Sequence, residues 1–147
     1  MSWVMQRRIV AHEGAVRDLL AALRARLRAL GETEETCGTV EIVIAEALNN
    51  IVEHAYGGTG GEIALDMARE TGGLCCILRD RGHPLPGLRL PEGTAPPAVT
   101  PRESLPEGGF GWFLIRALTE RLDYARADGE NRLTLHFGPG TGPDLRR

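Results

Sequence analysis

The stretch Glu46-Ala-Leu-Asn-Asn-Ile-Val-Glu-His54 decides how the rest of this chain is interpreted. Residues four apart in a helix share one face, so Glu46, Asn50 and His54 should stack one turn apart. Such a row suits polar chemistry, because the carboxylate can deprotonate a nucleophile and the amide oxygen can ligate a hard cation. Taken alone, Glu46 and Asn50 are more often ordinary surface residues, so the pattern needs support from elsewhere in the chain.

The helix that carries this stretch is predicted to run from about Glu34 to Tyr56, where Gly57-Gly58 ends it. Ile42 falls on the polar side of this helix, one turn before Glu46. Its position predicts that the polar side is partly covered, as the wall of a pocket is. The apolar stripe of the helix consists of Val40, Val43, Ala47, Leu48, Ile51, Val52 and Ala55.

Apolar periodicity predicts the elements on either side of this helix. A strand and a helix precede it, over Trp3–Val10 and between Glu13 and Gly31. Two strands, a helix and a final hairpin follow it: Glu62–Arg69, Leu74–Leu78, Gly111–Arg121, Leu122–Ala127 and Leu133–Phe137. This order predicts an α+β fold, with one helical layer on one mixed or antiparallel sheet. The tail over residues 138–147 is expected to be disordered.

Composition limits the function classes. The chain has 147 residues, is 42% hydrophobic and 25% charged, and fits one globular domain. A net charge of −3 gives no global positive field for nucleic acid, and no apolar run approaches the roughly 20 residues that cross a bilayer. We therefore expect neither nucleic acid nor a membrane as partner. Three cysteines cannot form a disulfide framework, which favours a cytoplasmic location.

Cysteines and histidines give no metal motif in the sequence. Cys75 and Cys76 fall in a predicted buried strand and are interpreted as core residues, because no activating base stands near them in the sequence. His54 is interpreted as a local structural partner within its helix. The remaining histidines lack ligand spacing: His12, His83 and His136.

Two glycine-containing segments flank a long proline-rich segment. Asp80-Arg81-Gly82 leaves the buried strand, where Gly82 permits close approach of a ligand, although an ordinary Asx turn explains Asp80 equally well. Gly108-Gly109-Phe110-Gly111 precedes a helix, where backbone amides can converge on an anion, but alone it is a weak signal. Residues 82–109 hold seven of the nine prolines. Such a segment is either a lid over a ligand or a passive insertion.

Taken together and in order, these segments resemble the Bergerat-fold (GHKL) ATPases and, within that superfamily, the small bacterial anti-sigma factor serine/threonine kinases. Residues 46–56 are similar to that family's N-box, residues 80–84 to its first glycine box and residues 109–115 to its second. The resemblance extends over roughly Arg8 to Phe137. It implies a two-layer α/β sandwich with helices on one face of a mixed sheet. This sandwich would form one domain over residues 1–137, with a lid over about 83–108.

The resemblance also implies roles for individual residues. Glu46 is implied as the catalytic base, Asn50 as the Mg²⁺ ligand and Asp80 as the acceptor of the adenine amino group. Thr134 stands where the family often has a threonine near the adenine. The other implied nucleotide-binding residues shape the walls around ATP: Gly82, Pro84, Gly108, Gly109, Phe110 and Gly111. In one departure, Pro84 stands where many members have a second glycine.

The leading hypothesis is an ATP- and Mg²⁺-dependent protein serine/threonine kinase that is also an anti-sigma regulatory factor. The resemblance implies that it phosphorylates an anti-anti-sigma (STAS) protein, sequesters a sigma factor and forms a homodimer. The altered first glycine box keeps a second hypothesis open, a nucleotide-gated binding module without phosphotransfer. A structural domain without nucleotide would require four correctly ordered motifs to be a coincidence.

Overall fold

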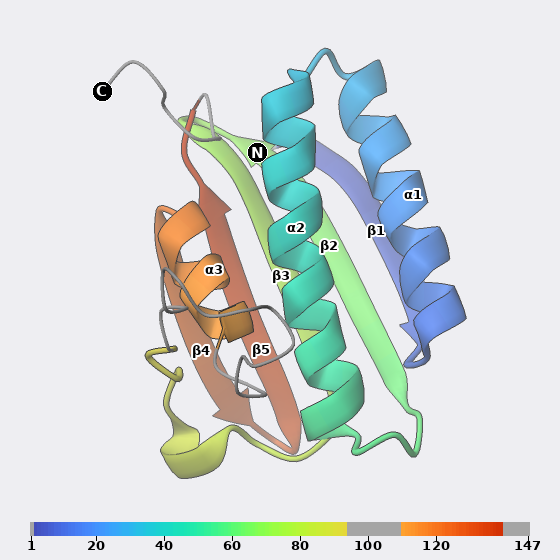
Figure 1. The fold of residues 1–147 in the computed structure, drawn as a ribbon, viewed down its shortest axis with the longest axis vertical. Helices are drawn as coiled ribbons and strands as arrows, with labels where there is room; N and C mark the ends of the chain where they lie inside the picture. Colours follow the sequence, from blue (N-terminus) through green and yellow to red (C-terminus); the bar gives the residue numbers. More distant parts are fainter. Residues whose placement is uncertain (1, 94–109, 140–147) are drawn as a thin grey trace, which may run out of the picture.

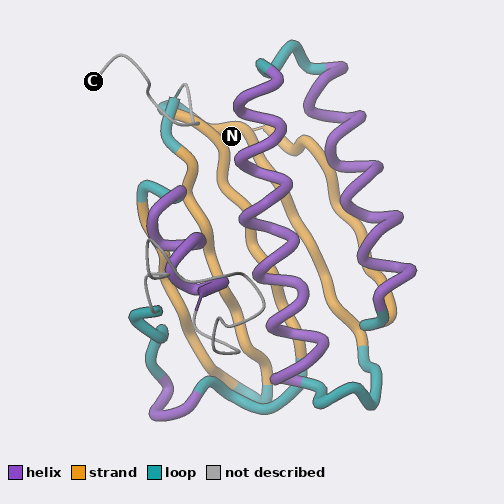
Figure 2. The backbone as a smooth tube through the Cα atoms, viewed as in Figure 1, coloured by secondary structure: helices purple, strands orange, loops and turns teal. Residues whose placement is uncertain are grey.

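The computed structural model describes residues 2–93 and 110–139. Helices and sheet form two layers, with the helices on one face of the sheet (Figures 1 and 2). Most of the predicted lid, the glycines Gly108 and Gly109, and the tail from residue 140 onward lie outside the described residues. The α+β prediction is confirmed.

The sheet has five strands in the order β1-β2-β3-β5-β4. Their bounds are Ser2–Val10 for β1, Glu62–Glu70 for β2, Gly73–Asp80 for β3, Arg121–Ala127 for β4 and Glu130–Phe137 for β5. All four pairings are antiparallel. The sheet is therefore antiparallel, one of the two arrangements that the element order left open, and not mixed as the resemblance implied.

Local hydrogen bonds fix where the two long helices begin. Helix α1 spans Glu13–Ala29, and the amide of Ala15 donates to His12 Nδ1 at its start. Helix α2 spans Glu34–Asn50, and the Thr36 amide donates to Thr33 Oγ1 at 3.1 Å. These side chains satisfy amides that the helix itself leaves unpaired. The third helix, α3, covers Phe110–Leu118 and packs beside α2.

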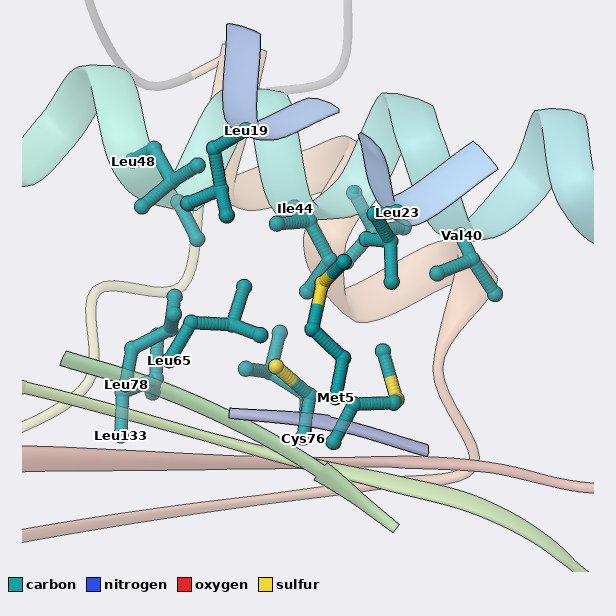
Figure 3. Close-up of a cluster of buried hydrophobic side chains, with 14 of the residues drawn as sticks. Met5, Leu19, Leu23, Val40, Ile44, Leu48, Leu65, Cys76, Leu78 and Leu133 are labelled. Atoms are coloured by element: carbon teal, nitrogen blue, oxygen red, sulfur yellow. The ribbon is translucent and has the colours of Figure 1, made fainter. Parts of the chain in front are cut away.

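The core lies between the two layers. Aliphatic side chains of α1 and α2 point down onto alternate residues of the sheet, as Figure 3 shows for Leu19, Ile44 and Leu78. The opposite set of strand residues, including Thr134 and His136 of β5, must then face away from the helices, because successive strand residues alternate. This alternation decides which residues can reach a site beneath the helices.

The predicted helix over Glu34–Tyr56 changes character at its end. α2 stops at Asn50 and continues as a π-helical turn, Ile51–Ala55, in which the Tyr56 amide donates to the Ile51 carbonyl at 3.0 Å. A π turn is wider than an α turn and often marks a functional site. His54 lies in this turn, and its side chain is 66% exposed.

Ile42 contradicts the prediction that the polar side of α2 is covered at that level. Its side chain belongs to the exposed large hydrophobic residues, at 48% exposure. One turn farther along, Glu46 is half-buried and lies against α3, so this helix face is covered from there on.

Candidate nucleotide-binding site

A cavity of about 420 Å³ lies where the end of α2, the end of β3 and the start of α3 meet. This volume falls within the range of small-molecule sites. Most of its lining is apolar, with a few polar groups among them. The lining residues are Ala47, Asn50, Ile51, His54, Ala55, Asp80, His83, Pro84, Leu85, Pro86, Pro91, Trp112, Tyr124, Asn131 and Leu133.

Asp80 is the buried carboxylate of this cavity, with 5% of its surface exposed. Its Oδ1 accepts from the Gly82 amide and from Asn131 Nδ2, both at 2.9 Å. Burial raises the pKa of the Asp80 carboxyl, while the hydrogen bond from Asn131 opposes that shift. Among the described residues no donor contacts Oδ2, so one oxygen is fixed and the other can accept from a ligand. The Asx turn thus uses one carboxylate oxygen and leaves the other open to a ligand.

Gly82 lets this turn approach the π-helical turn. A Cβ on Gly82 would lie 2.4 Å from the Ala55 carbonyl oxygen, so a larger residue meets rigid backbone there. The next amide, that of His83, donates to the same oxygen at 2.7 Å. Pro84 follows and lines the cavity. The first glycine segment is therefore fixed against the end of the N-box helix.

Asn50 faces the cavity from the last turn of α2. Its Nδ2 is buried and has no hydrogen-bond partner among the described residues. A buried polar group without a partner is costly unless a ligand or water satisfies it. An amide side chain also offers an oxygen that hard cations accept as a ligand, so Asn50 fits the Mg²⁺ that its motif implies.

Glu46 lies one turn before Asn50 but does not line the cavity itself. Its carboxylate contacts the first turn of α3, where a Cβ on Gly111 would lie 2.6 Å from Glu46 Oε2. Gly111 therefore permits the close approach of α3 to this carboxylate. The structure brings Glu46, Asn50 and Gly111 together, whereas Phe110 begins α3 without lining the cavity. From this helix the lining residue is Trp112.

Thr134 is not at the site. It pairs with Ile77 on the sheet face opposite the helices, because its neighbours Leu133 and Leu135 point into the core. The prediction identified the correct strand, but Thr134 points to the face of the sheet opposite the cavity. The residue of β5 beside the carboxylate is Asn131, which pairs with Asp80 across β3 and β5.

Asn131 is the centre of a hydrogen-bond network that sequence reasoning missed. Its Nδ2 donates to Asp80 Oδ1 and to the His83 carbonyl, each at 2.9 Å. Its Oδ1 accepts from Tyr124 Oη at 2.6 Å and from Arg126 Nη1 at 3.0 Å. The same network holds the backbone that follows, because the Leu85 amide donates to Tyr124 Oη at 3.0 Å. Only the register between β3 and β5 could have revealed that Asn131 meets Asp80.

The segment after the first glycine box is tied to α3. Arg116 Nε donates to the Pro91 carbonyl at 2.7 Å, and its Nη2 donates to the Leu90 carbonyl at 3.2 Å. Gly93 adopts a positive φ of 83°, and a Cβ there would lie 2.4 Å from the Phe113 amide nitrogen. The first residues of the predicted lid therefore pack on the helix of the second glycine box.

The sequence profile of the histidine kinase-like ATPase domain matches residues 9–137. The chain belongs to this family. The match covers every element from the end of β1 to the end of β5, and it includes all the cavity-lining residues. The resemblance inferred from the N-box and the glycine boxes is thereby confirmed.

Curated relatives of this ATPase-family chain are serine-protein kinases named RsbW. The kinase from Halalkalibacterium halodurans is 30% identical over 117 residues, which are 79% of this chain and 70% of the relative. The kinase from Oceanobacillus iheyensis is 31% identical over 109 residues, 73% of this chain and 67% of the relative. Within its family, the chain therefore groups with the anti-sigma serine-protein kinases.

A solved structure shares the fold of this family member. It contains the RsbU and RsbW domains of a Mycobacterium tuberculosis protein, with a TM-score of 0.60 at 21% identity. The match covers 95% of this chain and 35% of that one. Within the described residues, no helix has the length and apolar character needed to cross a bilayer.

Proposed function

We propose that the chain binds ATP in the cavity beside Asp80 and transfers its γ-phosphate to a serine or threonine hydroxyl of a partner protein. The observation that carries this proposal is the buried Asp80, whose Oδ2 is open to accept from the adenine amino group. The apolar lining from Ile51 and Leu133 suits the faces of a base. Relationship to serine-protein kinases supports the transfer step.

The chain's own residues have distinct tasks in this reaction. Glu46 takes the proton as the substrate oxygen bonds to the γ-phosphorus, while the bond from that phosphorus to the bridging oxygen of ADP breaks. Asn50, with its unpartnered Nδ2, holds the phosphate end of the nucleotide. Mg²⁺ bound at the Asn50 side-chain oxygen would neutralise phosphate charge. Gly111 keeps α3 close to the Glu46 carboxylate.

The partner is an anti-anti-sigma protein of the STAS type, and the chain sequesters a sigma factor as a homodimer in the cytoplasm. This part of the proposal rests on the family resemblance that the motif order carries, whereas the names of the relatives support the serine-protein kinase activity alone. Phosphate on the partner adds charge at the docking surface and releases it. The freed kinase then binds the sigma factor.

A nucleotide-gated binding module remains the alternative, and one observation favours it. Glu46 stands outside the cavity lining, so the cavity can hold a nucleotide whether or not that carboxylate reaches a substrate. The two functions differ only in phosphate transfer. They share the predicted dependence of nucleotide binding on Asp80 and Asn50.

Calorimetry of ATP and ADP binding with Mg²⁺ tests the shared part. Asp80→Asn places an amide donor opposite the adenine amino group, which also donates, so their hydrogen bond is lost. A hydrogen bond to a charged group contributes about 1.5–3 kcal/mol, and ATP binding should therefore weaken roughly 10- to 100-fold. Asn50→Ala should weaken binding only when Mg²⁺ is present. Asp18→Asn, on the exposed side of α1, is the matched control. If the wild type binds no nucleotide, both functions are overturned. If it binds ATP but transfers no phosphate to a STAS protein, the nucleotide-gated binding module is the remaining function.

A further inference from the structure

Three potential metal ligands meet on the sheet face opposite the helices. Glu70 ends β2, Cys75 lies in β3 and His136 lies in β5. Cys75 and His136 are direct cross-strand partners. One carboxylate oxygen, the thiol sulfur and one ring nitrogen of these residues all lie within 4.8 Å of one another. Three adjacent strands thus present an oxygen, a sulfur and a nitrogen donor at one point.

This cluster is separate from the nucleotide cavity. None of its residues lines that cavity, and their strand neighbours Leu74, Cys76 and Leu135 point into the core on the other face. The cluster is also sheltered, although no described helix covers this face (Figures 1 and 2). Cys75 is 5% exposed, and the His136 side chain is 15% exposed.

We propose that Glu70, Cys75 and His136 bind a zinc-class transition-metal ion, with water in the fourth position. Thiolate and imidazole ligands favour Zn²⁺ over the hard cations Mg²⁺ and Ca²⁺. Zinc bond lengths of about 2.0–2.3 Å place neighbouring ligand atoms about 3.3–3.8 Å apart. His136 Nδ1 and Glu70 Oε1 are 3.1 Å apart, so small side-chain rotations bring the set to this geometry.

The surroundings of His136 supply the outer support that metal-bound histidines use. Asp123 Oδ2 lies 3.6 Å from His136 Nε2, on the side of the ring away from the proposed metal. A metal on Nδ1 leaves Nε2 protonated, and that N–H then donates to the Asp123 carboxylate. A carboxylate behind a ligating histidine fixes its tautomer and orientation.

Metal binding requires a change of tautomer at His136 and the loss of the Cys75 thiol proton. Without metal, Arg121 Nη2 donates to Nε2 at 2.9 Å, so Nδ1 carries the ring proton and donates to Glu70. On binding, the ring proton moves from Nδ1 to Nε2 through solvent, and the Cys75 thiol releases its proton to the buffer. Arg121 Nη2 then loses its acceptor on the ring and turns to solvent, while Arg121 Nε keeps Asp123 as partner at 3.2 Å. Thiolate and Glu70 carboxylate together neutralise the charge of a divalent ion.

Titration of the chelator-treated full chain with Zn²⁺, and separately with Co²⁺, tests the proposal without nucleotide. One equivalent of Zn²⁺ should bind, and Co²⁺ should give a thiolate-to-metal charge-transfer band. Cys75→Ala and His136→Ala should abolish both signals. Asp123→Asn should weaken Zn²⁺ binding roughly tenfold. A hundredfold excess of Zn²⁺ over Kd should raise Tm by roughly 5–10 °C.

Matched variants separate the site from general effects. Cys76→Ala removes the neighbouring thiol, which points into the core, and Thr134→Ala changes the same outer face of β5. Both should keep the metal signals. Asp80→Asn should keep them too, so failure of the nucleotide site and failure of the metal site are distinguishable. Zn²⁺ binding that survives Cys75→Ala, or the absence of any charge-transfer band, overturns the proposal and leaves a His136–Glu70 hydrogen bond beside a thiol.

Discussion

The two ends of the nucleotide cavity are built differently. At the Asp80 end, Asn131 and the Gly82 amide fix the carboxylate through hydrogen bonds of 2.9 Å. At the other end, Asn50 has a buried Nδ2 without a partner among the described residues, and Glu46 stands outside the lining. Preorganised groups bind with little loss of conformational freedom. Under the proposed function, the fold itself sets base recognition at the Asp80 end, whereas a bound nucleotide would complete the phosphate end at Asn50.

The largest effect is expected from Glu46→Gln, which removes the proton acceptor and keeps the shape. General base catalysis contributes roughly 10²–10⁴-fold, so phosphate transfer to a STAS protein should fall by that factor. ATP affinity should stay unchanged, because Glu46 does not line the cavity. Single-turnover transfer and calorimetry measure the two quantities.

Glu53→Gln, on the exposed side of the π-helical turn, is the control for a lost carboxylate near the site. Equal loss of transfer in both variants would contradict the assigned role of Glu46. A parallel loss of ATP affinity in Glu46→Gln would show that the two ends of the cavity are not separable.

Gly111→Ala tests the close approach of α3. The new Cβ would lie 2.6 Å from Glu46 Oε2, so the carboxylate must move. Displacement of a catalytic group by about 1 Å can cost roughly 100-fold, and transfer should fall by up to this factor with a small change in ATP affinity. Gly38→Ala is the matched control, because a Cβ there meets nothing within 4 Å. Unchanged transfer in Gly111→Ala would mean that Glu46 does not act from this position.

Asn131→Ala tests the Asp80 end of the cavity, where hydrogen bonds hold the carboxylate in place. It removes the donor to Asp80 Oδ1 and to the His83 carbonyl, and hydrogen bonds of this kind contribute about 0.5–1.5 kcal/mol each. ATP affinity should fall roughly 10-fold, and the transfer rate at saturating ATP should change little. Tyr124→Phe removes the hydrogen bonds of Tyr124 Oη with Asn131 and with the Leu85 amide but leaves the Asn131 donor to Asp80 in place, so it should give a smaller loss. If Asn131→Ala lowers the transfer rate but not the affinity, the network acts on the phosphate end instead.

The sequence predicted the elements and, in Asn50, Asp80 and Pro84, three residues that line the cavity, because these depend on local patterns. Periodicity identified the strands and helices, and residues four apart correctly placed Glu46 and Asn50 on one side of α2. Asp80 and Gly82 followed from a glycine turn at the end of a strand.

What sequence could not predict depends on register between distant strands. Asp80 meets Asn131 only through the β3–β5 pairing, and a shift of one residue there would exchange Asn131 for a residue of the other face. The same pairing moved Thr134 away from the site and brought Cys75 beside His136, residues 61 positions apart in the chain. The π-helical turn also has no sequence signal that separates it from continued α-helix, so the helix was predicted to continue unchanged to Tyr56.

The smallest effect concerns the stability of the ligand-free protein. Burial raises the pKa of Asp80 above its ordinary 3.8, so the folded state favours the protonated carboxyl. The contribution of the protonated Asp80 carboxyl to the free energy of unfolding is fully present below pH 3.8. It is lost as pH rises through the pKa of Asp80 in the folded state. Asp80→Asn does not titrate and keeps an oxygen for the Gly82 and Asn131 donors. Wild type should therefore lose stability relative to this variant over that pH range, in urea unfolding at a series of pH values. If the free energies of unfolding of wild type and variant change in parallel with pH, the charge of Asp80 does not destabilise the fold. Water in the cavity would then already solvate the carboxylate.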